Sequence, residues 1–191
     1  MKSIKILSLA AAVALFAACS GSKKDTTTDS AATTVVKTDT NTKITVDTTM
    51  VDSVFAKKAA VGGMAEVALG KMAAMKTKDP QIKDFAKMMV MDHGKANDEL
   101  LIIAKKNNVT LPMAPDSEHQ AKADSLKQLN GAAFDKAYVA LMVDGHQKTL
   151  NLMNKEAKYG KDPDFKAFAA KTAPTVQKHL DLITTIQGSM K

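Results

Sequence analysis

The sequence KDPQIKDFA at residues 78–86 recurs almost unchanged as KDPDFKAFA at residues 161–169. In both copies Asp directly precedes Pro. Asp is favoured as a helix N-cap, and Pro is favoured at the first helical position. Each copy therefore predicts a turn into a new helix. Because two such turns divide the chain after residue 47, we expect two helical hairpins.

Apolar side chains recur at steps of three and four residues on both sides of each turn, which is the pattern of amphipathic helices. The four stripes cover residues 55–73, 82–103, 139–157 and 165–186. Residues 107–131 join the hairpins and contain a predicted short polar helix over about 116–129. The expected fold class is all-α, a ferritin-like four-helix bundle in which this long connection crosses the bundle. An up-down-up-down bundle is the alternative.

The composition supports a helical domain and argues against a nucleic-acid partner. Of 191 residues, 45% are hydrophobic and only 4% are aromatic, which suits packed helices better than a β-sandwich. The net charge of +7 comes entirely from lysine, because the chain has no arginine. Nucleic-acid binders usually use arginine forks and stacking aromatics. We therefore interpret the lysines as a solvated surface and expect no nucleic-acid binding.

Residues 1–19 have the features of a bacterial lipoprotein signal. A short basic start precedes an apolar run at residues 6–18, which is too short to span a bilayer but typical of a signal peptide. The run ends in LFAAC at residues 15–19, which resembles a lipobox, the motif whose cysteine is lipidated and becomes the mature N-terminus. Cys19 is the only cysteine, so no intramolecular disulfide can form. We expect a lipid anchor on Cys19, and an ordinary secreted protein with an incidental cysteine is the alternative.

The next segment is expected to hold a domain away from a membrane. Residues 19–46 are rich in Thr, Ser and Asp and cannot bury enough apolar surface to fold, which predicts a disordered tether. Ser20 follows the cysteine, and by resemblance to lipoprotein sorting the absence of Asp there implies the outer membrane, facing the periplasm or the cell surface. The expected domains are a signal peptide at 1–18, the tether at 19–46 and the bundle at 47–191.

One titratable residue interrupts each apolar stripe, namely Glu66, His93, His146 and His179. At 1.5 Å per helical residue, Glu66 and His93 both lie about 20 Å from the first turn. On the same basis His146 and His179 both lie about 25 Å from the second turn. If the long connection reverses the second hairpin, the four side chains converge near the middle of the bundle.

One carboxylate and three imidazoles suit a transition metal such as Fe, Zn, Cu or Mn. Asp92 and Asp144 stand at the edges of the stripes and could be further ligands or hydrogen-bond partners of the histidines. Met88, Met89 and Met91 would favour copper through their thioethers, although methionine at helical spacing is also typical of a core. The alternative to a metal or ligand site is a buried polar layer that fixes the register of the helices.

The sequence contains no pattern that identifies an enzyme. There is no catalytic Ser or Cys constellation, no phosphate-binding Gly loop and no paired-Cys zinc motif. His119 lies in the polar connection, where we expect it to be solvated. We therefore expect a binding or structural module whose protein partner or small ligand is unknown. The alternative is an envelope metalloenzyme, or a protein of metal or oxidative stress, that uses the Glu and His cluster.

Several short motifs resemble those of the domain-of-unknown-function 4142 family of predicted outer-membrane proteins. They are MAE at 64–66, MVMDH at 89–93, FDKAY at 134–138, MVDGH at 142–146, and Pro174 followed by His179. The resemblance covers about residues 51–186 and implies a ferritin-like bundle with no established activity. Ferritin-like di-iron proteins carry Glu-x-x-His motifs. Here Val90 and Val176 occupy those glutamate positions, so an ordinary di-iron centre is not expected.

Overall fold

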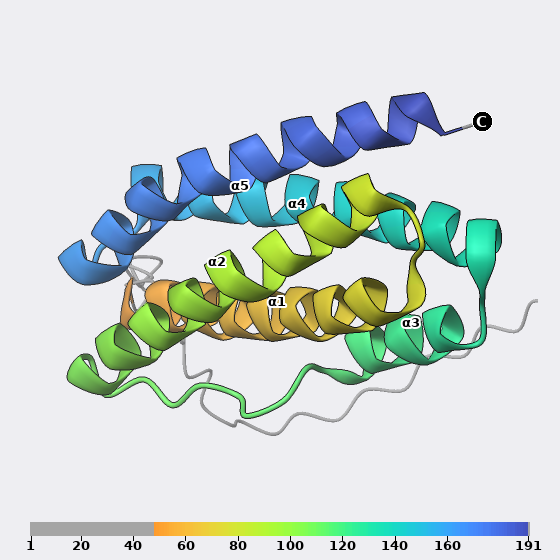
Figure 1. Cartoon of the computed structure of the whole chain (residues 1–191). Coiled ribbons are helices and arrows are strands. Elements are labelled where there is room, and N and C mark those ends of the chain that lie inside the picture. Colours follow the sequence, from red (N-terminus) through yellow and green to blue (C-terminus); the bar gives the residue numbers. More distant parts are fainter. Residues whose placement is uncertain (1–47, 191) are drawn as a thin grey trace, which may run out of the picture. The chain divides into compact units, whose positions relative to one another are not determined.

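The computed structural model of the protein describes residues 48–190, with side chains from residue 51 onward. The predicted signal peptide and tether, together with Cys19, lie outside the described residues. The five helices are α1 (Thr48–Lys76), α2 (Pro80–Lys106), α3 (Ser117–Lys127), α4 (Gly131–Tyr159) and α5 (Pro163–Ser189) (Figure 1). The predicted all-α class and the short helix in the connection are confirmed. Among these helices, none is both long and apolar enough to cross a bilayer.

Both Asp-Pro turns begin helices as predicted. At the first turn Asp79 accepts hydrogen bonds from the backbone N–H groups of residues 81 and 82, at 2.8 and 3.1 Å. At the second turn Asp162 does the same for residues 164 and 165, at 2.9 and 3.1 Å. Proline is the first residue of α2 and of α5. These caps satisfy amide groups that would otherwise have no partner at a helix start.

Contacts between helix ends show that the connection crosses the bundle. Asp52, near the start of α1, accepts hydrogen bonds from the backbone N–H groups of Lys161 and Asp162, both at 2.9 Å, just beyond the end of α4. Lys106, at the end of α2, lies 2.7 Å from Asp164 at the start of α5. Helices α2 and α4 therefore run in the same direction (Figure 1). The arrangement is the ferritin-like one, and the up-down-up-down alternative is wrong.

Helix α3 returns the chain to the end of the bundle where α4 begins, and it packs against α1 and α4. Lys76, the last residue of α1, donates a hydrogen bond to the carbonyl of Lys127 at 2.7 Å. The same ammonium lies 5.2 Å from the centre of the Phe134 ring. The ends of α1 and α3 and the start of α4 are thus joined, which fixes the direction in which the second hairpin enters the bundle.

Two aromatic clusters fill the core on either side of its middle. Near one end, Phe55 of α1 lies 6.2 and 6.4 Å from the rings of two phenylalanines of α5. Near the other end, Tyr138 of α4 lies 6.5 Å from Phe85 and 6.2 Å from Phe134. Edge-on and offset ring contacts at these distances are favourable. The polar residues that interrupt the stripes lie between the two clusters.

Helices α1 and α2 approach each other closely at Gly70. A Cβ atom at this position would lie 2.9 Å from the carbonyl oxygen of Ala86 and 3.2 Å from the Cβ of Met89. The first distance is shorter than real Cβ atoms show, so a larger residue would push the helices apart. Gly70 therefore lets the first hairpin pack tightly next to the polar layer.

Candidate metal centre

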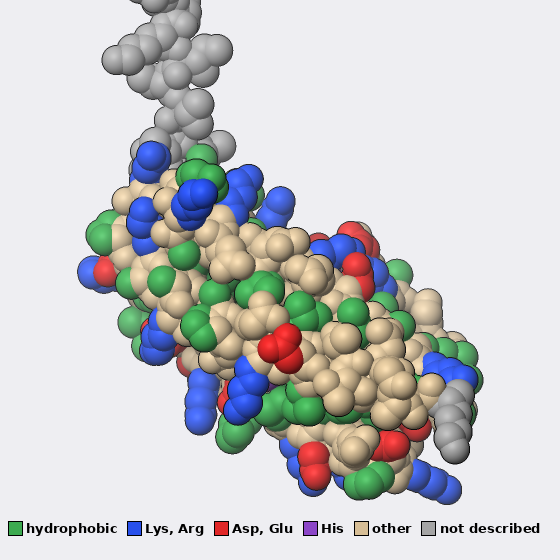
Figure 2. Space-filling view, turned by 90° about the horizontal axis from the view of Figure 1, so that it is seen from above, with side chains coloured by type: hydrophobic (Ala, Val, Ile, Leu, Met, Phe, Trp, Pro, Cys, Tyr) green, Lys and Arg blue, Asp and Glu red, His purple; other side chains and the backbone are tan. Residues whose placement is uncertain are grey.

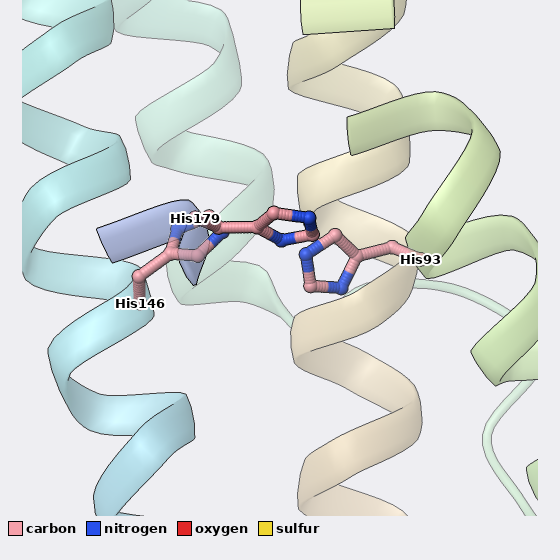
Figure 3. A group of neighbouring side chains, drawn as sticks. All are labelled: His93, His146 and His179. Carbon is pink, nitrogen blue, oxygen red and sulfur yellow. The ribbon is translucent and has the colours of Figure 1, made fainter. Parts of the chain in front are cut away.

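Three histidines from three different helices point toward one another inside the bundle (Figure 3). They are His93 of α2, His146 of α4 and His179 of α5, with ring centroids 5.3 to 5.5 Å apart. One possible ligand atom of each lies within 4.8 Å of those of the other two, and no other group of this kind occurs in residues 48–190. The three residues are at most 5% exposed. The spacing of the stripes had predicted this meeting point.

Each ring has one nitrogen next to an oxygen acceptor. The pairs are Glu66 Oε2 with His93 Nδ1 at 3.0 Å, Met142 O with His146 Nδ1 at 2.8 Å, and Asp92 Oδ2 with His179 Nε2 at 3.0 Å. The second nitrogen of each ring is buried and has no hydrogen-bond partner in the described part of the chain. An acceptor on one ring nitrogen favours the tautomer whose other nitrogen keeps its lone pair. When all three rings are neutral, the geometry therefore presents three imidazole lone pairs in one small volume.

Glu66 of α1 contacts two of the histidines on the side of the rings that faces away from the centre of the cluster. Its Oε1 atom lies 3.6 Å from Nδ1 of His146 and accepts a hydrogen bond from the hydroxyl of Thr149 at 3.5 Å. Because its two oxygens contact the Nδ1 atoms of His93 and His146, Glu66 orients these two rings. The sequence had suggested Glu66 as a ligand, and the structure places it as a hydrogen-bonding partner of the candidate ligands.

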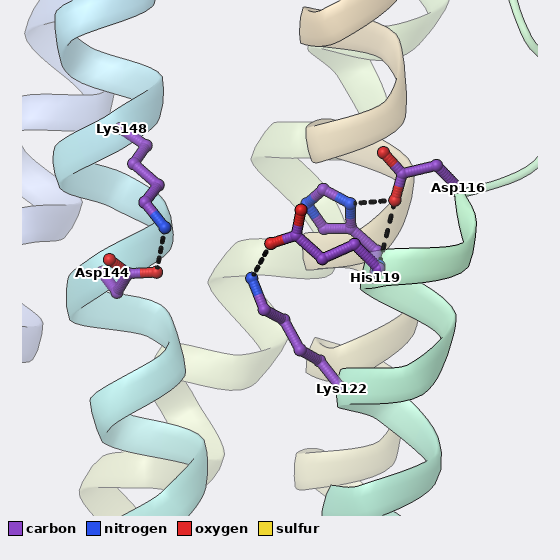
Figure 4. A network of polar contacts seen from close by, with 6 residues as sticks. Asp116, His119, Lys122, Asp144 and Lys148 are labelled. Carbon is purple, nitrogen blue, oxygen red and sulfur yellow. Dashed lines mark hydrogen bonds and ion pairs between the residues drawn. The ribbon is translucent and has the colours of Figure 1, made fainter. Parts of the chain in front are cut away.

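The two aspartates singled out from the sequence lie in different environments. Asp92 contacts His179 and is half-buried, whereas Asp144 is exposed and pairs with Lys148 at 2.7 Å (Figure 4). Asp92 directly precedes His93, but Asp144 stands two residues before His146. One residue corresponds to about 100° of rotation around a helix. This difference turns Asp144 toward solvent and away from the cluster.

The charges of Glu66 and His93 depend on each other. Burial would raise the pKa of Glu66, but the charge of His93 and its hydrogen bond outweigh burial and lower this pKa below 4.5. Burial would lower the pKa of His93, but the Glu66 carboxylate outweighs it and raises this pKa above 6.5. The carboxylate of Glu66 and the protonated form of His93 therefore stabilise each other. When His93 is protonated, a metal at its unpartnered nitrogen has to displace a proton from that ring.

The other two imidazoles are neutral at neutral pH. Burial lowers the pKa of His146, although Glu66 opposes the effect. Burial and the charge of His93 lower the pKa of His179 to about 4, against the opposing effect of the hydrogen bond that His179 donates to Asp92. Neutral imidazole is the form that binds metal ions. Two of the three candidate ligands are thus already in their metal-binding state.

The remaining residues suggested by the sequence are His119 and the methionine run of α2. His119 is bound to Asp116 at 2.6 Å in a polar network on the surface that includes α3 (Figure 4). Met89 is buried in the core, Met88 is half-buried, and Met91 is exposed. The methionine run therefore does not present its sulfur atoms on one face.

Two hollows lie near the cluster. A cavity of about 20 Å³, enough for one water molecule, is lined by Glu66, His93 and apolar side chains among others. A groove of about 360 Å³ between α2 and α5 has Phe85 in its lining. The Phe85 ring lies 5.9 and 6.4 Å from the rings of His146 and His179. This ring therefore lies between the groove and two of the three histidines.

Sequence reasoning missed a second buried polar site, the carboxyl pair of Asp52 and Glu156. Both residues are 4% exposed, and they share a hydrogen bond. Burial, Asp52 and Asp162 raise the pKa of Glu156 to about 7, against the opposing charge of Lys166. The sequence held a signal, because Glu156 follows buried Met153 by three residues and so continues the buried face of α4.

The fold and the cluster define a class of protein, a crossover four-helix bundle with a buried histidine triad. A family model described as "Domain of unknown function (DUF4142)" matches residues 37–186. The chain therefore belongs to this family, in agreement with the resemblance of its motifs. A comparison with proteins of curated function finds no match.

Solved structures share the fold at low sequence identity. A DUF305 fragment from Deinococcus radiodurans matches with a TM-score of 0.64 and 11% identity, covering 72% of this chain and 95% of that one. A DUF305 protein from Streptomyces coelicolor matches with a TM-score of 0.62 and 14% identity, covering 73% of this chain and 95% of that one. CopM in the Cu(I)-bound form matches with a TM-score of 0.60 and 14% identity, covering 70% of this chain and 93% of that one. At such identities these likenesses show the fold alone.

Proposed function

We propose that this chain is a lipid-anchored cell-envelope protein whose bundle binds one transition-metal ion through His93, His146 and His179. The observation that carries the proposal is the set of three buried ring nitrogens that face one another and have no hydrogen-bond partner among residues 51–190. Each ring is held from its other side by a carboxylate or a carbonyl. Metal-binding histidines typically have such partners.

A purely structural polar layer explains these nitrogens less well. Leaving a buried polar atom without a partner costs about 1–3 kcal/mol. If the layer served only to fix helix register, each of the three unpartnered ring nitrogens would be expected to have a hydrogen-bond partner, as the other nitrogen of each ring does. A single metal ion would satisfy all three at once.

The donor set favours copper or zinc. Imidazole suits both ions, whereas manganese and magnesium prefer carboxylate and water oxygens. The Glu66 and Asp92 carboxylates would offset the charge of the ion from behind the rings. CopM, which shares the fold, has a Cu(I)-bound form. That likeness supports a copper site in this type of bundle.

Binding without turnover fits the site better than catalysis. A catalytic metal needs an open coordination position that substrate can reach. The three imidazoles are at most 5% exposed, and Phe85 lies between two of them and the nearby groove. We therefore propose storage, buffering or delivery of the ion in preference to a metalloenzyme. The anchor on Cys19 is part of the proposal and rests on the resemblance of residues 15–19 to a lipobox. The outer-membrane location is also proposed and rests on Ser20, which stands where lipoprotein sorting would otherwise read Asp.

The test is a metal titration of the chain from residue 19 onward, with Cys19→Ser to exclude thiol binding. Cu(I), Zn(II), Fe(II) and Mn(II) are added while stoichiometry and the thermal midpoint are followed. We expect one copper or zinc ion per chain and a higher midpoint, because an ion that binds only the folded state stabilises it.

His179→Leu and Asp144→Asn are the matched variants. His179→Leu should abolish the metal-dependent rise in the midpoint, and Asp144→Asn on the surface should leave it unchanged. If no metal at millimolar concentration shifts the midpoint of the parent, the histidines form a structural layer. In that case His179→Leu is expected to be neutral or stabilising, because Leu fits the apolar stripe.

A further inference from the structure

One end of the bundle carries most of its exposed apolar side chains. We define this anchor-proximal end as residues 51–58, 100–106 and 153–170, where α1 and α5 begin and α2 and α4 end. Five of the nine large apolar side chains exposed in the described chain lie there: Val51, Val54, Leu101, Ile102 and Tyr159. Ile102 is 70% exposed and Tyr159 is 58% exposed. Apolar groups gathered in this way indicate an interaction surface.

The same end is strongly basic. Its three segments contain eight lysines and four acidic residues. Two of the acids, Asp52 and Glu156, are buried, Asp162 caps α5, and Asp164 pairs with Lys106. The solvated charge at this end is therefore positive. Figure 2 shows lysines together with apolar side chains at this end, which lies to the left in Figure 1.

The opposite end of the bundle is less basic and exposes fewer large apolar side chains. Residues 70–86, 117–138 and 182–190 contain seven lysines and five acids. Only Met75 and Leu182 are large apolar side chains exposed there. The combination of lysines with exposed apolar groups is therefore polarised toward one end of the bundle.

The anchor-proximal end is also where the chain from Cys19 enters the bundle. Helix α1 begins at residue 48, 29 residues after Cys19. At about 3.5 Å per extended residue, this segment spans at most roughly 100 Å. The segment therefore sets an upper limit on the distance of α1 from a lipid anchor. It also raises the local concentration of this end at the membrane surface.

We propose that the anchor-proximal end docks on the surface of an anionic phospholipid membrane. The lysines would bind lipid phosphates by charge attraction near the surface. Ile102 and Tyr159 would enter the interfacial region, where apolar and aromatic side chains are favoured. Lys158 lies 5.0 Å from the Tyr159 ring, so one charge accompanies the aromatic side chain. The inference rests on the anchored location proposed above and is independent of any metal.

The experiment uses the chain from residue 19 onward with Cys19→Ser, so that no acyl chain can bind the vesicles. A single cysteine, Ile102→Cys, carries a fluorophore that reports polarity. Met75→Cys is the matched control, because Met75 is 80% exposed at the opposite end. Vesicles contain phosphatidylcholine alone or with about 30% phosphatidylglycerol, to vary the surface charge.

We expect a blue shift at Ile102→Cys with the anionic vesicles only, no shift at Met75→Cys, and loss of the shift at about 0.5 M salt. In sedimentation, Lys105→Glu, Lys155→Glu and Lys158→Glu combined should weaken vesicle binding about tenfold or more. The control triple, with Lys71, Lys78 and Lys136 changed to Glu, has the same net charge and should retain most of the binding. Circular dichroism checks that both variants are folded.

Equal shifts at the two probes, or equal losses in the two triple variants, would overturn the proposal in favour of attraction without orientation. No binding to anionic vesicles would also overturn it and leave an acidic protein as the candidate partner for this end. Neither result depends on acylation or metal binding, which the Cys19 and His179 experiments test separately.

Discussion

Replacing Glu156 with Gln should make the bundle more stable above neutral pH. Glu156 is buried against Asp52, and its pKa is raised from 4.5 to about 7. In the unfolded chain the carboxyl returns to its ordinary pKa. Below pH 4.5 it is protonated in both states, so its contribution to folding is fully present. As the pH rises through 7, the folded state has to ionise a carboxyl beside a second buried one, and that contribution is lost.

The magnitude follows from the pKa values. At 1.36 kcal/mol for each pKa unit, a rise from 4.5 to about 7 corresponds to about 3 kcal/mol of stability lost between pH 4.5 and pH 8. Gln has nearly the same shape, stays neutral, and its amide N–H can donate to Asp52. Glu156→Gln should therefore match the parent near pH 4.5 and exceed it by about 3 kcal/mol at pH 8. In a domain of this size that is a rise of roughly 10 °C in the thermal midpoint.

The assay is denaturant unfolding from pH 4.5 to 8.5 in the presence of a chelator, for the parent and the variant. Glu118→Gln is the control, because Glu118 is exposed and pairs only with Lys122 on the surface. Its effect on stability should be small at every pH. Equal stability of Glu156→Gln and the parent at pH 8 would refute the argument, since the buried carboxyl would then carry no cost when ionised.

Four further outcomes are expected. Metal affinity should fall as the pH decreases, and the fall should begin above pH 6.5 because the pKa of His93 is raised. Metal titrations at several pH values measure this dependence. A metal affinity that does not change with pH above 6.5 would show that His93 is not a ligand. Cys19→Ala should abolish fatty-acid labelling and release the protein from membranes washed with about 0.5 M salt, which removes electrostatic docking. Retention after this wash, or unchanged labelling, would contradict acylation at Cys19. Gly94→Ala should stabilise the bundle by up to about 1 kcal/mol, because nothing lies within 4 Å of the new Cβ. Gly70→Ala should destabilise it by about 1–3 kcal/mol, because its Cβ would meet the backbone of α2. The reverse order in chemical denaturation would contradict the last pair.

Much of the fold could be predicted because its signals are local. The Asp-Pro caps and the steps of three and four residues depend on a few neighbours, and all four stripes became helices where expected. Spacing from the turns was enough to place His93, His146 and His179 at one level. The direction of the second hairpin was left open, because it depends on where α3 packs. The spacing of apolar residues within the connection does not show that α3 packs against α1 and α4.

The roles of the acidic residues were harder to predict. The sequence could not decide whether Glu66 would be a ligand or a partner of the histidines, because that depends on side-chain rotamers and on contacts across helices. Asp92 and Asp144 look equivalent in the sequence but differ by one position relative to the following histidine, and the helical rotation separates them. The pairing of Asp52 with Glu156 joins residues 104 positions apart, and no local pattern links them.

The division of the triad between the hairpins has a mechanical consequence. One histidine belongs to the first hairpin and two belong to the second, with the whole connection between them. A metal ion held by all three would act as a reversible cross-link, closing a loop of more than 50 residues from His93 to His146. Closing loops of this length restricts the unfolded chain strongly, as a disulfide does. In a chain with one cysteine, metal supply and pH would then control how firmly its two halves are joined.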